Sequence, residues 1–197
     1  MGFLTGIVLG AGSSRRLGQP KQLLPFAGST LLGASVQRAR ECQFDQLLVT
    51  IGGAATDVRA HVDFTGTEVV ESRDHAEGCS ASLRVALTRV DPRADGFVLL
   101  LGDQPRVLPH VVHELVDHVG GGPIGICRYV DGLGHPLWFG RETFADLRRM
   151  HGDKAVWKLV HSDAYPVVEL PVDTPVPVDV DTWADYERLT QAEATTR

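Results

Sequence analysis

The chain has 197 residues, which is enough for one domain with a sizeable core and short for two. With 43% hydrophobic and 22% charged residues it has the composition of an ordinary globular protein. Its formal net charge of −6 argues against a surface that wraps nucleic acid, and no segment has the pattern of a membrane anchor.

The cysteines and the N-terminal segment bear on the cellular compartment. Cys42, Cys79 and Cys127 are widely spaced, and they form neither a metal-ligand pair nor a disulfide framework. The first residues lack the basic segment and long apolar run of a secretory signal. We therefore expect one cytoplasmic domain over residues 1–197, with no nucleic-acid or membrane partner.

Strand-like and helix-like segments alternate along the chain. Strands are expected at residues 5–9, 46–51, 68–70, 96–101, 124–129, 136–139, 167–170 and 176–180. Helices are expected at residues 31–41, 54–61, 80–90, 109–119, 141–150, 154–161 and 183–191, with Thr30 and Thr182 as caps of the first and last. This alternation predicts an α/β fold with a mostly parallel central sheet, whose ligand lies at the carboxyl ends of the strands.

A glycine-rich loop with several cations follows the first expected strand, in the order LGAGSSRRLGQPK from residue 9 to residue 21. The backbone N–H groups of such a loop can surround an anion, and Arg16 and Lys21 can stabilise charge on a transferred phosphoryl group. The loop is not a Walker A motif, because no Lys-Ser or Lys-Thr follows its last glycine. It lacks the third glycine of a dinucleotide fingerprint. A solvated basic loop is the alternative interpretation.

Acidic residues follow two of the later strands. Asp103 comes directly after the most apolar expected strand, and Asp179 and Asp181 lie near the expected strand at 176–180. Carboxylates at such positions can hold Mg²⁺ against a triphosphate. For Asp103 the alternative is a turn residue or a helix cap. Strand alternation would place Asp179 and Asp181 on one side, and the role of Asp179 stays open between a hydrogen-bond acceptor behind the metal site and a turn residue.

Residues 9–21 resemble the signature loop L-A-A-G-x-S-x-R-x-G-x-x-K of nucleotidyltransferases with a molybdopterin-guanylyltransferase-like fold. Within that superfamily the chain most resembles the molybdenum cofactor cytidylyltransferases, over nearly its whole length. Gly10 stands where alanine is usual, and the smaller glycine is expected to be tolerated. The resemblance implies a three-layer, Rossmann-like nucleotidyltransferase fold and metal binding by Asp103 and Asp181. It also implies nucleotide binding by Leu9, Gly10, Ala11, Gly12, Ser13, Ser14, Lys21 and Asp103.

Three later segments carry the same resemblance. Residues 78–83 resemble the nucleotide-contacting G-x-S-x-S-L segment, which implies roles for Gly78, Ser80 and Ser82, whereas the residues alone indicate a helix capped by Ser80. Residues 134–136 resemble the G-[HN]-P segment near the molybdopterin phosphate, which makes His135 an acceptor-binding candidate; a structural histidine is the alternative.

The last of these segments, residues 152–157, departs from the pattern it resembles. It matches the start of G-D-x-G-A-R but lacks the second glycine and the arginine. Asp153 and Lys154 are the acceptor-binding candidates here, with Lys154 supplying the missing positive charge. The departure bears on the identity of the acceptor more than on the transfer chemistry.

The resemblance implies a Mg²⁺-dependent transfer of CMP from CTP to molybdopterin with release of pyrophosphate. A substrate phosphate is already an anionic nucleophile, so positioning, the metal and Arg16, Lys21 and Asp103 would supply the catalysis. CTP is preferred to GTP because residues 10–12 resemble the cytidylyl loop more than L-A-G-G. A molybdoenzyme or its maturation factor is the expected protein partner.

Other functions stay open at this point. The nearest are a guanylyltransferase acting on molybdopterin or phospholactate, and a sugar-phosphate nucleotidyltransferase. A non-catalytic nucleotide-binding or cofactor-delivery module is an alternative from a different class.

Overall fold

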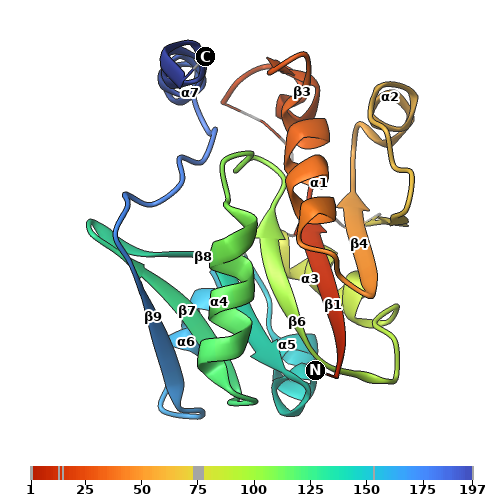
Figure 1. Ribbon diagram of the computed structural model, residues 1–197. Coiled ribbons are helices and arrows are strands. Elements are labelled where there is room, and N and C mark those ends of the chain that lie inside the picture. The colour runs from red at the N-terminus through yellow and green to blue at the C-terminus, as the bar shows by residue number, and fades with distance from the viewer. Residues whose placement is uncertain (1, 13, 15, 73–77, 153, 197) are drawn as a thin grey trace.

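A seven-stranded sheet in the order β5-β4-β1-β6-β8-β7-β9 forms the centre of the molecule (Figure 1). The computed structural model describes residues 2–12, 14, 16–72, 78–152 and 154–196. The strands of the sheet are β1 (Phe3–Leu9), β4 (Gln46–Ile51), β5 (Glu68–Glu71), β6 (Ala94–Leu101), β7 (Ile124–Tyr129), β8 (Gly132–Gly140) and β9 (Val167–Val172). β8 runs antiparallel to β6 and β7, and the other strand pairs are parallel. The predicted α/β fold with a mostly parallel sheet is thus confirmed.

Helices cover both faces of the sheet and complete three layers (Figure 1). One face carries α1 (Leu31–Glu41), α2 (Ala55–His61) and α4 (Pro109–Val119). The other face carries α3 (Cys79–Leu87), α5 (Phe144–Arg149), which follows the 3₁₀ helix η3 (Arg141–Thr143), and α6 (Ala155–Val160).

The strands are apolar on both sides because they feed two cores. In β6, Val98 and Leu100 pack into the core under α1 and α4, whereas Phe97 and Leu99 pack into the core under α3 and α5. All four side chains are 5% exposed or less. Successive residues of a strand point to opposite faces, so a strand covered on both faces reads as a continuous apolar run.

The ends of α1 and α4 follow the expected local chemistry. Thr30 accepts a hydrogen bond from the Gly33 N–H at 3.0 Å and so caps α1. Pro109 lies in the first turn of α4, and Gly120 ends that helix with a left-handed backbone at φ 58°.

The expected strand at residues 176–180 is wrong. The described residues 173–182, which we call the C-terminal strap, form neither helix nor strand and run past the carboxyl ends of the strands to α7 (Trp183–Thr196) (Figure 1). Pro175 and Pro177 lack the N–H groups that a paired strand requires. At the start of α7, Thr182 Oγ1 accepts from Asp185 N–H at 3.3 Å, and Asp185 accepts from Thr182 N–H at 2.7 Å.

Helix α7 and the strap return to the N-terminal part of the chain. A third buried cluster joins them to the loop after β1 and to the hairpin of β2 (Pro25–Phe26) and β3 (Ser29–Thr30). Its buried members are Leu17, Leu24, Phe26, Leu31, Val180 and Leu189. Tyr186 also donates its hydroxyl hydrogen to the Pro25 carbonyl at 2.6 Å.

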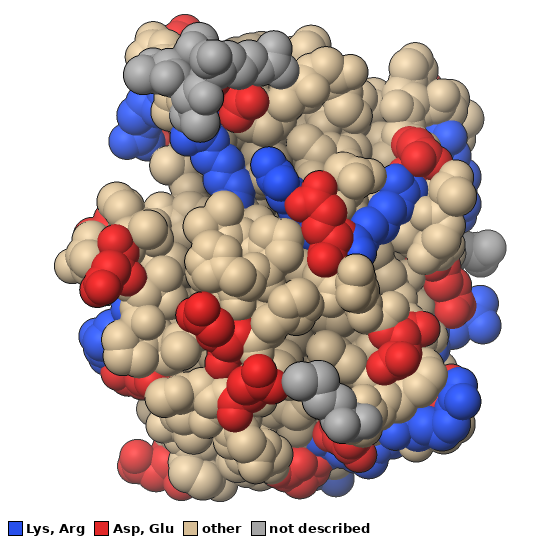
Figure 2. Space-filling model, in the orientation of Figure 1, with Lys and Arg blue, Asp and Glu red and all other residues tan. Residues whose placement is uncertain are grey.

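The surface carries charges of both signs, as expected for a formal net charge of −6. On the face shown in Figure 2, basic and acidic side chains are interspersed. Two arginines of α1 are paired with acids: Arg38 lies 2.9 Å from Glu41, and Arg40 lies 3.1 Å from Asp63. Within the described part of the chain, no helix combines the length and apolar character needed to cross a bilayer.

Candidate active site

The glycine-rich loop and Asp103 meet at the carboxyl ends of β1 and β6. These strands are parallel neighbours with Leu9 opposite Leu101, so the segments that leave them start side by side. Gly102 N–H donates to the Leu9 carbonyl at 2.9 Å, and a Cβ atom on Gly102 would lie 3.0 Å from Gly10 Cα. Glycine at residue 102 is what lets the Asp103 turn approach the loop this closely.

Gly10 is required by its surroundings. A Cβ atom at this position would lie 2.8 Å from the Thr50 carbonyl oxygen and 2.9 Å from Leu32 Cδ1. The Gly10 N–H donates to the same carbonyl at 3.0 Å. Glycine at residue 10 is therefore needed and not merely tolerated. The usual alanine would force the backbone of β4 or the loop to shift.

Gln22 holds the loop in shape, and the sequence analysis did not identify it. Its buried side-chain amide donates to the carbonyls of Gly10 at 2.9 Å and Gly12 at 2.7 Å. Ser14, with a left-handed φ of 51°, accepts from Lys21 N–H at 2.9 Å. A polar residue directly after the loop lysine is the one available signal for this role. Leu9 and Ala11 lie at the end of β1 and just beyond it, and Ser13 lies outside the described residues.

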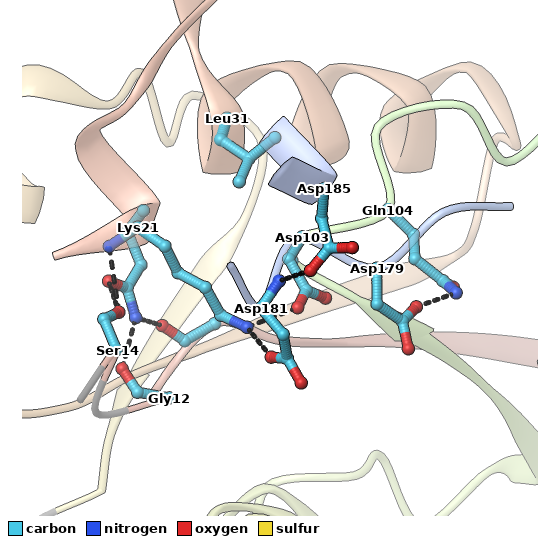
Figure 3. A network of polar contacts seen from close by, with 12 residues as sticks. Gly12, Ser14, Lys21, Leu31, Asp103, Gln104, Asp179, Asp181 and Asp185 are labelled. Carbon is cyan, nitrogen blue, oxygen red and sulfur yellow. Dashed lines mark hydrogen bonds and ion pairs between the residues drawn. The ribbon is translucent and has the colours of Figure 1, made fainter. Parts of the chain in front are cut away.

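Lys21 joins carboxylates from two distant parts of the chain (Figure 3). It lies in the 3₁₀ helix η1 (Lys21–Leu23), and its Nζ is 2.5 Å from Asp103 Oδ2 and 3.0 Å from Asp181 Oδ1. Arg16 Nη2 lies 2.9 Å from the other oxygen of Asp181. The Lys21 side chain is only 15% exposed, so the alternative of a solvated basic loop does not describe it.

The pKa values of this network follow from burial and pairing. Burial by itself lowers the pKa of Lys21, but attraction to Asp103 and Asp181 outweighs it and raises the pKa above its ordinary value. Burial favours a higher pKa for Asp181, yet hydrogen bonds and attraction from Lys21 and Arg16 bring that pKa below its ordinary value. At neutral pH the lysine is therefore a cation and Asp181 an anion.

Asp179 faces a different partner from Asp181. The Gln104 side-chain amide donates to the Asp179 carboxylate (Figure 3) and, at 3.0 Å, to the Pro177 carbonyl. Partial burial, together with repulsion from Asp103, raises the pKa of Asp179 to about 6. Because residues 176–180 are not a strand, the two aspartates do not share one strand face, and each has its own contacts.

Asp103 and Asp181 fit a divalent cation. Their carboxylates already converge on one cation, the Lys21 ammonium group, and carboxylate oxygens are the donors that Mg²⁺ and Mn²⁺ prefer. Asp103 lies in the turn after β6, whereas Leu108 is the N-cap of α4, so Asp103 is not that helix's cap. The described residues contain no group of three or more His, Cys, Asp or Glu arranged as a metal site. Further ligands would then be phosphate oxygens and water.

The segment at the start of α3 is organised differently from the prediction. Gly78, with φ 100°, is the N-cap, the helix begins at Cys79, and no side chain caps it. The proposed cap by Ser80 is therefore wrong, since Ser80 lies inside the first turn and, like Ser82, is buried. Arg84 donates to Ser80 Oγ at 3.3 Å and to the Met150 carbonyl at 2.9 Å, which ties α3 to the C-terminal end of α5.

His135 and Lys154 lie apart from the Lys21 network. His135 is a buried residue of β8 with a cis bond to Pro136, and its ring meets Trp157 edge-on at 5.9 Å between centroids. Burial lowers the pKa of His135 to about 4, so the ring is neutral at neutral pH. Lys154 is exposed just before α6, and Asp153 lies outside the described residues. No hydrogen bond or ion pair between described residues joins His135 or Lys154 to Lys21, Asp103 or Asp181.

Comparison with known proteins places this site in a family. A family model described as the MobA-like NTP transferase domain matches residues 6–170. Purine catabolism protein PucB of Bacillus subtilis (strain 168) is 26% identical over 96% of this chain and 97% of its own length. Bifunctional protein GlmU of Geobacter metallireducens is 27% identical over 72% of this chain, which spans 30% of the length of GlmU.

Solved structures with a similar sequence and fold cover almost the whole chain. The crystal structure of Rv0371c from Mycobacterium tuberculosis H37Rv is 58% identical, with a TM-score of 0.91 over 95% of this chain and 97% of that one. A complex of Rv0371c with manganese is 54% identical, with a TM-score of 0.87 over 96% of this chain and 98% of that one. The family match ends at residue 170, and the fold then adds Asp181 to the matched region. The chain is a nucleotidyltransferase that belongs to the MobA-like NTP transferase domain family.

Proposed function

We propose that this protein is a Mg²⁺-dependent cytidylyltransferase that transfers CMP from CTP to molybdopterin and releases pyrophosphate. The observation that carries the proposal is the convergence of Lys21, Asp103 and Asp181 beside the glycine-rich loop. Metal-assisted nucleotidyl transfer requires carboxylates that converge on a cation next to a loop suited to phosphates. The preference for CTP and the molybdopterin acceptor rest on the loop sequence and on the segment around His135.

Each residue of the network has a part in the proposed mechanism. The loop at residues 9–14 would bind the phosphates through its N–H groups, and Lys21 and Arg16 would stabilise the negative charge that develops on the transferred phosphoryl group. Asp103 and Asp181 would hold the divalent cation, which supplies charge neutralisation and orients the phosphates when bound. The manganese complex of the similar Rv0371c supports a divalent metal.

The acceptor phosphate would attack in line with the departing pyrophosphate. Because that phosphate is already ionised at neutral pH, no side chain has to remove a proton from it. The buried and neutral His135 suits a hydrogen-bonding role toward the acceptor, and the exposed Lys154 suits attraction of an anionic group. A molybdoenzyme or its maturation factor is the proposed recipient of the product.

One observation favours a second candidate with the same chemistry and a different acceptor. Trp157 stands where the related G-D-x-G-A-R segment has its arginine, and its ring contacts His135 and His161. An indole in place of a guanidinium removes a bidentate anion-binding group. A guanylyltransferase for phospholactate or a sugar-phosphate nucleotidyltransferase is therefore the second candidate.

Asp103→Asn tests the transfer chemistry. Purified protein, Mg²⁺ and each of the four nucleoside triphosphates are incubated with molybdopterin, with phospholactate or with sugar 1-phosphates, and pyrophosphate release is measured. We expect turnover with CTP and molybdopterin, and a loss of about 10²-fold or more in Asp103→Asn. Asp117→Asn, at an exposed position of α4, is the matched control and should keep wild-type turnover.

Four outcomes would contradict parts of this proposal. GTP preference would overturn the cytidylyl assignment, and turnover with another acceptor alone would support the second candidate. Full turnover in Asp103→Asn would remove the metal role of Asp103. Nucleotide binding without any turnover would favour a binding or cofactor-delivery module.

A further inference from the structure

The two carboxylates proposed to hold the metal come from segments that are far apart in sequence. Asp103 lies in the turn after β6, and Asp181 lies on the C-terminal strap. The strap forms no helix or strand in the described structure, so regular backbone pairing does not fix its position. The separation of the two carboxylates therefore depends on side-chain contacts: the ion pairs with Lys21, the packing of Val180, and the contacts between the strap and that turn.

Gln104 makes those contacts through its side chain. Its Nε2 donates to the Asp179 carboxylate, as Figure 3 shows, and to the Pro177 carbonyl at 3.0 Å. Gln104 directly follows Asp103, and Asp179 is two residues before Asp181. The side chain thus connects the residue directly after one proposed ligand to the residue two positions before the other.

The environment of Gln104 makes this connection stiff. The residue is 3% exposed, and its Oε1 is buried without a hydrogen-bond partner among the described residues. Burying an oxygen without a hydrogen bond costs free energy of folding. The two hydrogen bonds donated by Nε2 are therefore the favourable polar contacts that this side chain makes in the fold. An amide suits the position because both facing groups, a carbonyl and a carboxylate, are acceptors that a glutamate at residue 104 would repel.

Apart from the Asp181 ion pairs and the packing of Val180 into the third buried cluster, the strap's other attachments lie farther along it or within α7. Val176 N–H donates to Asp131 at 2.8 Å, and Val130 N–H donates to the Thr174 carbonyl at 3.2 Å. At the other end, the Asp181 N–H donates to Asp185 at 3.2 Å, within the start of α7. These bonds hold the strap's ends, whereas the Gln104 bonds tie its middle to the Asp103 turn.

We infer that Gln104 is a positioning residue that sets the separation of the Asp103 and Asp181 carboxylates for a divalent cation. This role rests on the proposed function, because it assumes that both aspartates bind the metal. It predicts that the combined length of the Gln104 and Asp179 side chains matters more than either residue by itself.

A length-swap experiment tests this role without changing any charge. Gln104→Asn shortens one side chain of the pair by a methylene group, and Asp179→Glu lengthens the other by the same amount. Binding of Mn²⁺ alone to the full chain is measured by the loss of the free-ion electron paramagnetic resonance signal. We expect each single variant to bind Mn²⁺ at least about 10-fold more weakly, and the double variant to return to within about 3-fold of wild type.

Two control variants separate this role from general loosening of the strap and from failure of the metal assignment. Asp131→Ala removes the bond to Val176 and should leave Mn²⁺ affinity unchanged. Asp103→Asn should lose Mn²⁺ binding. Wild-type affinity in Asp103→Asn would overturn the metal assignment itself, and the Gln104 role with it.

Other results would overturn the positioning role of Gln104 while leaving the metal assignment intact. It is overturned if Asp103→Asn loses Mn²⁺ while both single length variants keep wild-type affinity, or if the double variant folds but binds no better than the singles. Thermal unfolding of each variant accompanies the binding data. Asp179 lies on the strap, which forms no helix or strand, so Asp179→Glu remains informative if Gln104→Asn fails to fold.

Discussion

Lys21 places a positive charge between Asp103 and Asp181, the two carboxylates that are proposed to bind a metal. Its ammonium group is within 3.0 Å of both Asp103 and Asp181, and its side chain is largely buried. A cation in this position offsets the repulsion that two converging carboxylates would otherwise feel. The same cation must compete with a divalent ion for the same oxygens.

Lys21→Met tests this competition at the level of one residue. Removing the ammonium group takes away the cation that both carboxylates share and leaves Asp181 paired with Arg16, so Mn²⁺ binding to the nucleotide-free protein should tighten by about 10-fold, equivalent to about 1.4 kcal/mol. Paramagnetic resonance titration measures the affinity. Arg16→Met is the matched control, because among the described residues Arg16 pairs with Asp181 and not with Asp103, and it is 68% exposed. An equal gain in both variants would indicate a general charge effect and would contradict specific competition by Lys21.

His135 gives a pH dependence with a defined sign. Its pKa in the fold is about 4 because the ring is buried, against an ordinary value of about 6.5. Between these values the unfolded chain binds a proton that the folded chain does not, so the free energy of unfolding falls as the pH decreases from 6.5 to 4. The contribution of this one residue is on the order of 3 kcal/mol over that window.

His135→Asn checks this dependence, because asparagine does not titrate. Urea unfolding at pH 7 and pH 4.5 should show a smaller loss of stability in the variant than in wild type. The comparison uses the difference between the two pH values, so any constant packing cost of the substitution cancels. Equal losses in the two proteins would show that His135 is not the group responsible.

At the scale of elements, the site depends on how closely the segments after β1 and β6 approach each other. A glycine directly follows each strand, and the backbone of Gly10 lies 3.0 Å from where a Cβ atom on Gly102 would be. The apolar runs of these strands are visible in the sequence because both faces of the sheet are covered. The contact between their ends depends on strand order, which pairs β1 with β6 although β4 and β5 come between them in the sequence.

Gly10→Ala tests the packing at this junction. The new methyl group would meet the Thr50 carbonyl, which belongs to the backbone of β4, so a shift of the loop is required. We expect a loss of about 1–3 kcal/mol in the free energy of unfolding, measured by urea denaturation, together with reduced turnover. Gly12→Ala is the control for stability, since its Cβ would meet only Lys21 Cε, at 3.6 Å. Unchanged stability in Gly10→Ala would contradict the close packing.

At the scale of the whole molecule, the C-terminal helix completes a site that starts at residue 9. Leu189 on α7 and Val180 on the strap are buried against Leu17, Leu24 and Leu31 from the N-terminal part of the chain. This cluster holds the strap that carries Asp181 against the loop that carries Lys21. Loss of its packing should therefore affect both stability and metal binding.

Leu189→Ala tests this coupling. The side chain is 1% exposed, so its truncation should lower the free energy of unfolding by about 2–5 kcal/mol and weaken Mn²⁺ binding. Urea denaturation and the Mn²⁺ titration measure the two effects. Leu108→Ala, at a 41% exposed position, should change stability by less than about 0.5 kcal/mol. A destabilised Leu189→Ala that binds Mn²⁺ like wild type would show that α7 does not position Asp181.

Local patterns determined most of the elements and the outline of the site. Apolar runs located the strands of the sheet, Thr30 and Pro109 marked helix starts, and the glycine-rich loop and Asp103 were recognised by their position after strands. The strand expected at residues 176–180 failed because alternation of apolar and acidic residues was weighed above Pro175 and Pro177, which cannot donate to a neighbouring strand. The cap expected at Ser80 failed because Gly78 already supplies the turn into α3.

Tertiary structure alone decided which polar residues meet. Side chains at residues 21, 103 and 181 approach one another because the order of the strands and the return of α7 bring their segments together, and no spacing in the sequence encodes those distances. Gln22 and Gln104 carry no recognisable motif, since a glutamine is ordinarily a surface residue and only burial shows that its amide is committed to a partner. The sequence by itself therefore determined the fold class and the glycine-rich loop at one end of the candidate site. The pairing of its charges was decided by long-range packing.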